Sequence, residues 1–199
     1  MNTDNIADKI IDLKNQDEQL RDELIRKGKL SDGYDPSMEA LHNRNAEILN
    51  DIIDVIGYPT IDKVGKAASE AAWLIIQHAI GQPGFLKKCR HLLENAVSEN
   101  KADPVSLAYL TDRIAVLEGA PQLFGTQFDW DENGALSPNH FDDVTRVNER
   151  RKRIGLNTLE EQTALIRQRV ASENQTPPAD ADKRKHDMNQ WRKKTGWIK

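Results

Sequence analysis

The chain has 199 residues, of which 38% are apolar and 30% are charged, with a net charge of −4 at pH 7. This length is typical of one domain, and the mixture is too apolar for a wholly disordered chain. No apolar run reaches the about 18–20 residues that a membrane-spanning helix needs, and the start of the chain lacks the pattern of a secretory signal. A single cysteine, Cys89, excludes an internal disulfide and a Cys-rich zinc site. We therefore expect a cytoplasmic protein.

The first part of the chain predicts two amphipathic helices. Residues 5–27 place apolar side chains at alternating steps of three and four residues, with Asp17 at the one polar step. A second helix is expected to begin at Asp35, which can cap it, followed by a proline at the first helical position. Asn45 interrupts the apolar face of this helix. A turn at 31–33 would connect the two helices as an antiparallel hairpin.

Residues 61–80 predict the central helix of the fold. In the segment 64–80, apolar side chains cover most of the circumference of a helix. A helix that is apolar nearly all round is a buried helix. Thr60 can cap its start, and the turn at 81–84 ends it.

Two further helices, over 85–96 and 103–118, are expected before an irregular segment. Residues 121–136 have no helical period and predict an extended loop or a small hairpin. The segment 129–136 resembles the first half of a calcium-binding loop. However, His140 stands where such a loop needs a bidentate glutamate, and this favours a hairpin turn.

The chain after this segment predicts two more helices and a linker. Residues 141–154 form a short polar helix, and Thr158 with Glu161 makes a capping box that begins a last helix ending near Ser172. Residues 174–182 contain two prolines and no apolar period, which is typical of a linker.

The charges are distributed unevenly between the body and the C-terminal segment. Residues 1–173 hold 21 basic and 29 acidic side chains, whereas 174–199 hold 7 basic and 3 acidic ones. The basic segment 183–199 also carries Trp191 and Trp197. It can be disordered, can dock on the acidic body, or can bind nucleic acid.

These observations predict an all-α fold, a helical bundle around the buried helix at about 61–80. A small irregular or hairpin insert is expected at about 119–140. We expect an N-terminal helical hairpin over 1–56, packed as one compact unit with a helical domain over 57–173. A linker and basic tail would occupy 174–199.

His78 and its neighbour Gln77 lie inside the expected buried helix. The His78 ring leaves the apolar face that includes Leu74 and Ile75. A buried imidazole needs hydrogen-bond partners, because without them it destabilises the fold by about 1–3 kcal/mol. The two residues therefore either form a structural polar pair or place a general acid/base histidine at the floor of a pocket.

Asp112 and Arg113 lie side by side on an expected helix and point about 100° apart. One hypothesis gives them a structural salt bridge. The other has Asp112 orient the ring of His78, with Arg113 holding an anionic group. In the irregular segment, Thr126 and Gln127 follow a glycine and can face a ligand.

No ligand pair stands at a known metal-binding spacing, and we expect neither a metal ion nor another cofactor. A metal site assembled by folding from His78, Asp112 and Glu118 is an alternative. The arginines and lysine between 146 and 153 form a basic cluster that is either a solvated face or one side of an anion site.

Five short motifs occur in one order: 57-GYPT-60, 73-WLIIQHA-79, 109-YLTDR-113, 121-PQLFGTQ-127 and 147-VNERRKRIGL-156. Over about residues 57–165 the chain resembles a bacterial domain family of unknown function that has these motifs, although Phe124 stands where the family has tyrosine. The resemblance implies that one group of polar residues belongs together: Gln77, His78, Asp112, Arg113, Gln122, Thr126, Gln127 and Arg151.

We therefore predict a site for a small anionic ligand, at which metal-independent acid/base catalysis can take place. His78 would exchange a proton, Asp112 would orient it, Arg113 and Arg151 would hold the anion, and Gln77 and Gln127 would position it. One alternative is a protein-interaction module, such as an immunity or effector protein in a bacterial conflict system. Another is nucleic-acid binding through 183–199.

Overall fold

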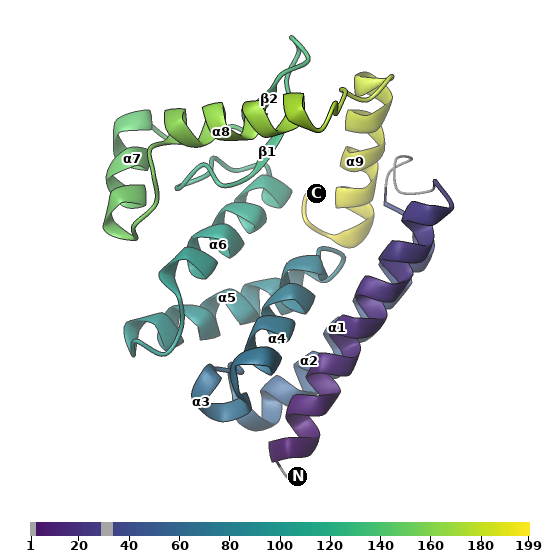
Figure 1. Ribbon diagram of the computed structural model, residues 1–199, viewed down its shortest axis with the longest axis vertical. Helices are drawn as coiled ribbons and strands as arrows, with labels where there is room; N and C mark the ends of the chain where they lie inside the picture. The colour runs from purple at the N-terminus through teal and green to yellow at the C-terminus, as the bar shows by residue number, and fades with distance from the viewer. Residues whose placement is uncertain (1–2, 29–33) are drawn as a thin grey trace. The chain divides into compact units, whose positions relative to one another are not determined.

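The computed structural model describes residues 3–28 and 34–199, with side chains from Asn5 onward, so the turn expected at 31–33 lies outside the described residues. Within these ranges the regular structure consists of helices and one two-stranded sheet (Figure 1). The all-α prediction is confirmed. None of the described helices combines the length and the apolar character needed to cross a membrane.

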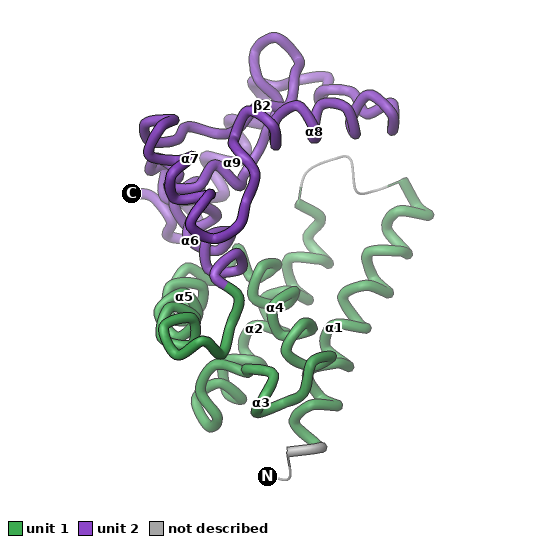
Figure 2. The backbone as a smooth tube through the Cα atoms, turned by 60° about the vertical axis from the view of Figure 1, so that its left-hand side comes forward, with its two compact units in different colours: residues 1–103 green, residues 104–199 purple. Residues whose placement is uncertain are grey.

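The chain divides into two compact units, unit 1 (Met1–Asp103) and unit 2 (Pro104–Lys199) (Figure 2). The boundary follows the helix that ends at Ser98, so the two N-terminal helices share a unit with the next three. The elements of unit 1 are α1 (Thr3–Arg26), α2 (Pro36–Ile56), α3 (Ile61–Val64), α4 (Lys66–His78) and α5 (Pro83–Ser98).

The start of α2 follows from its sequence. Asp35 accepts hydrogen bonds from the amides of Ser37 and Met38, and the following proline occupies the first turn. Such a cap satisfies amides that the first turn of a helix leaves without an internal partner. The helix ends at Gly57, whose φ is 71°.

The expected single helix over 61–80 is broken in the structure. Gly65 has a φ of 78° and separates α3 from α4. A residue in this conformation cannot continue a right-handed helix. In α4, Ala72 and Ile76 are buried, but Trp73 and Leu74 are only half-buried. The prediction of a helix buried all round was therefore wrong in this detail.

The core of unit 1 lies where α1 contacts α2 and α4. Burying one large aliphatic side chain contributes about 1.5–3 kcal/mol to stability. The most buried aliphatic side chains of this unit, each with at most 1% of its surface exposed, are Ile10, Leu49, Ile75, Ile76, Leu86 and Leu93.

Unit 2 combines helices with the hairpin that the sequence predicts. Strand β1 (Phe128–Trp130) pairs antiparallel with β2 (Leu136–Pro138). In the turn, Asp131 accepts hydrogen bonds from the amides of Asn133 and Ala135 and from the hydroxyl of Ser137. The carboxylate thus stabilises the hairpin turn that we favoured over a calcium loop. The helices are α6 (Pro104–Glu118), α7 (Val144–Arg153), α8 (Leu159–Ser172) and α9 (Ala181–Thr195).

The basic tail forms α9 and packs on its own unit. Arg192 donates a hydrogen bond to the carbonyl of Leu117 at 2.6 Å, which satisfies a carbonyl at the end of α6. Arg184 forms an ion pair with Asp129 at 2.7 Å, and Trp197 is buried. The structure thus shows this segment docked on its own unit, and nucleic-acid binding by the segment stays a prediction.

Candidate functional site

Four polar side chains meet in unit 1, and we call them the His–Asp cluster: Tyr34, Asp17, His42 and His78. Nδ1 of His78 lies 2.8 Å from Oδ2 of Asp17, and Nε2 of His42 lies 3.1 Å from the same oxygen. The Tyr34 hydroxyl is 2.7 Å from Nδ1 of His42. Asp17 is 1% exposed and His42 is 7% exposed, whereas the side chain of His78 is 32% exposed. The cluster therefore reaches from the core to the surface at His78.

The helices bring these groups together because each carries a polar residue on or beside its apolar face. Asp17 interrupts the apolar stripe of α1, and His42 lies one turn after Met38 on the buried face of α2. His78 is the last residue of α4. Asn45, the other polar interruption, donates a hydrogen bond to the carbonyl of Leu13 at 3.1 Å and joins α1 to α2.

Charge is distributed asymmetrically within the cluster. Burial would raise the pKa of the Asp17 carboxyl, but its contacts with His42 and His78 outweigh this and hold the pKa well below its ordinary value. Burial, together with the charges of Glu39 and Asp17, raises the pKa of Tyr34 above its ordinary value. Asp17 is therefore a carboxylate, and Tyr34 is a neutral phenol.

Two buried atoms of the cluster have no hydrogen-bond partner among the described residues: Oδ1 of Asp17 and Nε2 of His42. The latter is close to Asp17 but makes no aligned hydrogen bond with it. A buried polar atom without a partner costs about 1–3 kcal/mol. One ligand atom each from Asp17, His42 and His78 lies within 4.8 Å of the others, and these residue types can hold a metal ion.

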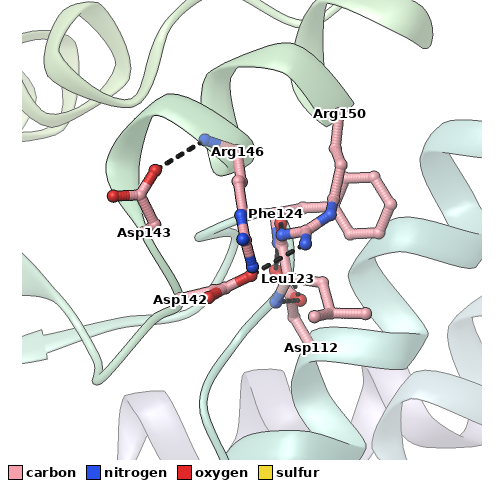
Figure 3. Close-up of polar contacts among 7 residues, drawn as sticks. All are labelled: Asp112, Leu123, Phe124, Asp142, Asp143, Arg146 and Arg150. Atoms are coloured by element: carbon pink, nitrogen blue, oxygen red, sulfur yellow. Dashed lines mark hydrogen bonds and ion pairs between the residues drawn. The ribbon is translucent and has the colours of Figure 1, made fainter.

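Unit 2 contains a second polar network, which is built around Asp112 of α6 (Figure 3). The buried carboxylate accepts hydrogen bonds from the amides of Leu123, Phe124 and Thr126 at 2.8, 3.1 and 2.9 Å. It also accepts one from the Thr126 hydroxyl at 3.0 Å. Burial raises the pKa of Asp112 above its ordinary value, and these hydrogen bonds oppose the rise. Asp112 thus anchors the loop over residues 122–127.

Gln122 fixes the same loop from inside. Its side-chain amide donates to the carbonyls of Gln127 and Asn139 at 3.0 and 2.9 Å, and its Oε1 accepts from the Gln127 amide at 2.7 Å. The side chain of Gln127 in turn donates to the hydroxyl of Thr126 at 3.0 Å. Gln122 is fully buried, and its polar atoms are occupied by the protein itself.

Arginines close the network from α7. Arg151 is buried and donates to the carbonyl of Phe124 at 2.8 Å and to the carbonyl and side chain of Asn157. Arg150 donates to the carbonyl of Leu123 at 3.1 Å and pairs with Asp142 at 2.7 Å (Figure 3). These two arginines therefore hold backbone carbonyls of the loop.

The structure divides the site residues that the sequence predicts between the two units. Gln77 and His78 lie in unit 1, and the other six lie in unit 2. Arg113 is half-buried, and burial lowers the pKa of its guanidinium. We expected Asp112 to orient His78, but the carboxylate that contacts Nδ1 of His78 is that of Asp17. The oxygens of Asp112 accept hydrogen bonds from the 122–127 loop instead. No pattern in the sequence singles out His42, and Asp17 stands out only as a polar interruption of an apolar stripe.

A family model matches residues 5–172, and its description is a family of unknown function, DUF6624. The chain belongs to the DUF6624 family. The expected membership in a family of unknown function is thereby confirmed. The match includes both Asp17 and Asp112 and ends before α9. No curated protein and no solved structure matches the chain.

Proposed function

We propose that unit 1 of this DUF6624 protein binds a small molecule at the His–Asp cluster and exchanges a proton with it through His78. The observation that carries the proposal is the 2.8 Å contact between Nδ1 of His78 and the carboxylate of Asp17. Because Asp17 is ionised, Nδ1 bears the proton of the neutral ring. Nε2 is then the proton acceptor, and the ring is partly exposed to solvent.

A buried carboxylate behind an imidazole is an arrangement that supports proton transfer. The carboxylate sets the tautomer and orientation of the ring and stabilises the imidazolium that forms. General acid/base catalysis of this kind contributes about 10²–10⁴-fold to a rate. In this proposal Asp17 has the positioning role that the sequence analysis assigned to Asp112.

The anionic nature of the ligand remains a prediction. Its sequence-based support was the set of basic and amide side chains, but Gln122 and Arg151 use their polar atoms within unit 2. The interaction-module and nucleic-acid alternatives also remain predictions. For the latter, Arg184 and Arg192 of the tail are engaged with unit 2, while Lys193 and Lys194 are exposed.

The proposal can be tested with p-nitrophenyl acetate, whose hydrolysis a base accelerates by taking a proton from the attacking water. Untagged, chelator-treated full-length protein is compared with His78→Gln and with His91→Gln, which removes an exposed histidine of α5. We expect His78→Gln to lower the protein-dependent rate at least about tenfold and His91→Gln to leave it unchanged. Equal rates for the wild type and His78→Gln would contradict the proposal.

A further inference from the structure

We infer that Asp17, His42 and His78 bind a divalent transition-metal ion in unit 1. The inference deepens the proposed function and rests on it for the role of the site, because it names a cofactor for the same cluster. One ligand atom of each residue lies within 4.8 Å of the others, and the contacts to Oδ2 of Asp17 point to Nε2 of His42 and Nδ1 of His78 as the ring nitrogens.

Two buried atoms of the cluster favour a bound cation. In the metal-free protein Nδ1 of His78 donates its proton to Oδ2 of Asp17, and a bound ion would replace that proton. Oδ1 of Asp17 and Nε2 of His42 are buried without a hydrogen-bond partner among the described residues, although Nε2 lies 3.1 Å from Oδ2 of Asp17. Both atoms are electron-pair donors once the imidazole is neutral, and their side chains are in contact through Oδ2 of Asp17. One cation between them would satisfy both.

The surroundings of His42 are those of a metal-binding histidine. A histidine that binds a metal through one ring nitrogen usually donates a hydrogen bond from the other, and this fixes its tautomer. Nδ1 of His42 is 2.7 Å from the Tyr34 hydroxyl, and the two rings are stacked with centroids 5.7 Å apart. With the proton on Nδ1, the lone pair of Nε2 points toward Asp17. Tyr34 is thus a positioning residue for the ligand His42.

The spacing of the ligand atoms is close to what an ion requires. Ligand bonds of about 2.0–2.1 Å in a tetrahedral site place neighbouring ligand atoms about 3.3 Å apart. The distances from Oδ2 of Asp17 to the two ring nitrogens are 2.8 and 3.1 Å. Lengthening these two contacts by a few tenths of an ångström would give them the spacing that an ion needs.

The ligand types select the class of ion. Two imidazoles and one carboxylate suit Zn²⁺ and its first-row neighbours, whereas Ca²⁺ and Mg²⁺ prefer oxygen ligands. Three protein ligands also leave a coordination position for water or for a small molecule. The half-exposed His78 places that position near solvent. A bound ion lowers the pKa of its water to about 7, so that the hydroxide left after this water loses a proton would act as the base in place of Nε2 of His78.

The test is a calorimetric titration of untagged, chelator-treated full-length protein with Zn²⁺, accompanied by visible absorption with Co²⁺. We expect one ion per chain. Loss of one ligand in Asp17→Asn, His42→Asn or His78→Asn should weaken binding at least about 100-fold. Asp12→Asn, an exposed carboxylate of the same helix α1, and His91→Asn should bind as the wild type does. Circular dichroism verifies that each variant is folded.

His78→Asn is the decisive variant. His78 is half-buried and is the last residue of α4, so its substitution disturbs the folded structure least among the three ligands. Because Tyr34 positions His42, we expect Tyr34→Phe to weaken Zn²⁺ binding about 10–100-fold. Absence of one-to-one binding, or equal affinity of the wild type and His78→Asn, would overturn the inference.

The outcomes separate this inference from the proposed function. If Zn²⁺ does not bind but His78→Gln still lowers ester hydrolysis, only the metal site is wrong. If Zn²⁺ binds through the cluster but hydrolysis by the metal-free protein does not depend on His78, only the proposed proton exchange is wrong.

Discussion

Asp17 in unit 1 and Asp112 in unit 2 are both buried aspartates on helices, but their carboxylates have different partners. Both oxygens of Asp112 accept hydrogen bonds from the 122–127 loop. Asp17 meets two imidazoles through one oxygen, and its other oxygen has no partner among the described residues. All acceptor positions of Asp112 are therefore used to hold a loop in place. Asp17 retains an oxygen that could bind a ligand, and its cluster reaches the surface through His78.

Removing each carboxylate in turn tests this difference between Asp17 and Asp112 most directly. Asp112→Ala leaves three loop amides without their acceptor, at about 1–3 kcal/mol each, so unit 2 should lose at least about 3 kcal/mol of stability. Asp17→Asn should also destabilise unit 1, because the contacts with two imidazoles outweigh the cost of burying the charge. The loss should be smaller than that in Asp112→Ala, since asparagine keeps an oxygen that can accept a hydrogen bond from an imidazole.

Hydrogen exchange measured by mass spectrometry separates these effects, because it reports on residues 122–127 and on α1 independently. Faster exchange of the loop in Asp112→Ala is the expected result. If instead Asp17→Asn destabilised its unit as strongly, the cluster would be a structural anchor like that of Asp112.

A smaller effect is expected at Gly125, which shapes the anchored loop. Its φ is 62°, and a Cβ atom there would lie 2.6 Å from Cδ1 of Leu159. Gly125→Ala should therefore destabilise unit 2 by about 1–3 kcal/mol. Gly155→Ala is the matched control, because Gly155 has a φ of 76° but no atom within 4 Å of such a Cβ. Equal losses in urea denaturation would show that backbone strain, and not contact with Leu159, determines the effect.

The smallest effect is expected for the rate at which Cys89 is alkylated, which reports on the packing of unit 1. Its thiol is fully buried in α5, and burial raises its pKa to about 12. Iodoacetamide at pH 8 should therefore leave the folded protein unmodified and should react completely in urea. The thiol should remain protected in Asp17→Asn. Rapid modification of that variant would show that the cluster maintains the packing of unit 1.

The sequence was most informative where local rules decide the structure. The cap at Asp35, the hairpin near Asp131 and the capping box at Thr158 all occur as expected, because each depends on residues close together in the chain. The break at Gly65 was missed, since the apolar pattern continues across it. A glycine inside such a pattern can either continue or end a helix.

The residues of the candidate site could be predicted only in part from local sequence patterns. Asp112, Gln122 and Arg151 belong to the group that the family motifs imply, and in the structure they hold the 122–127 loop. Asp17 and His42 were visible only as polar residues on apolar stripes. Which imidazole such a carboxylate meets depends on how α1, α2 and α4 pack, and no local pattern records that packing.

The measurement that tests the central claim most directly is a crystal structure of the protein grown with Zn²⁺, with anomalous scattering recorded at the zinc edge. We expect one strong anomalous peak bonded to Asp17, Nε2 of His42 and Nδ1 of His78, with Tyr34 still contacting His42. A cluster without a peak, in which His78 keeps its hydrogen bond to Asp17, would contradict the account.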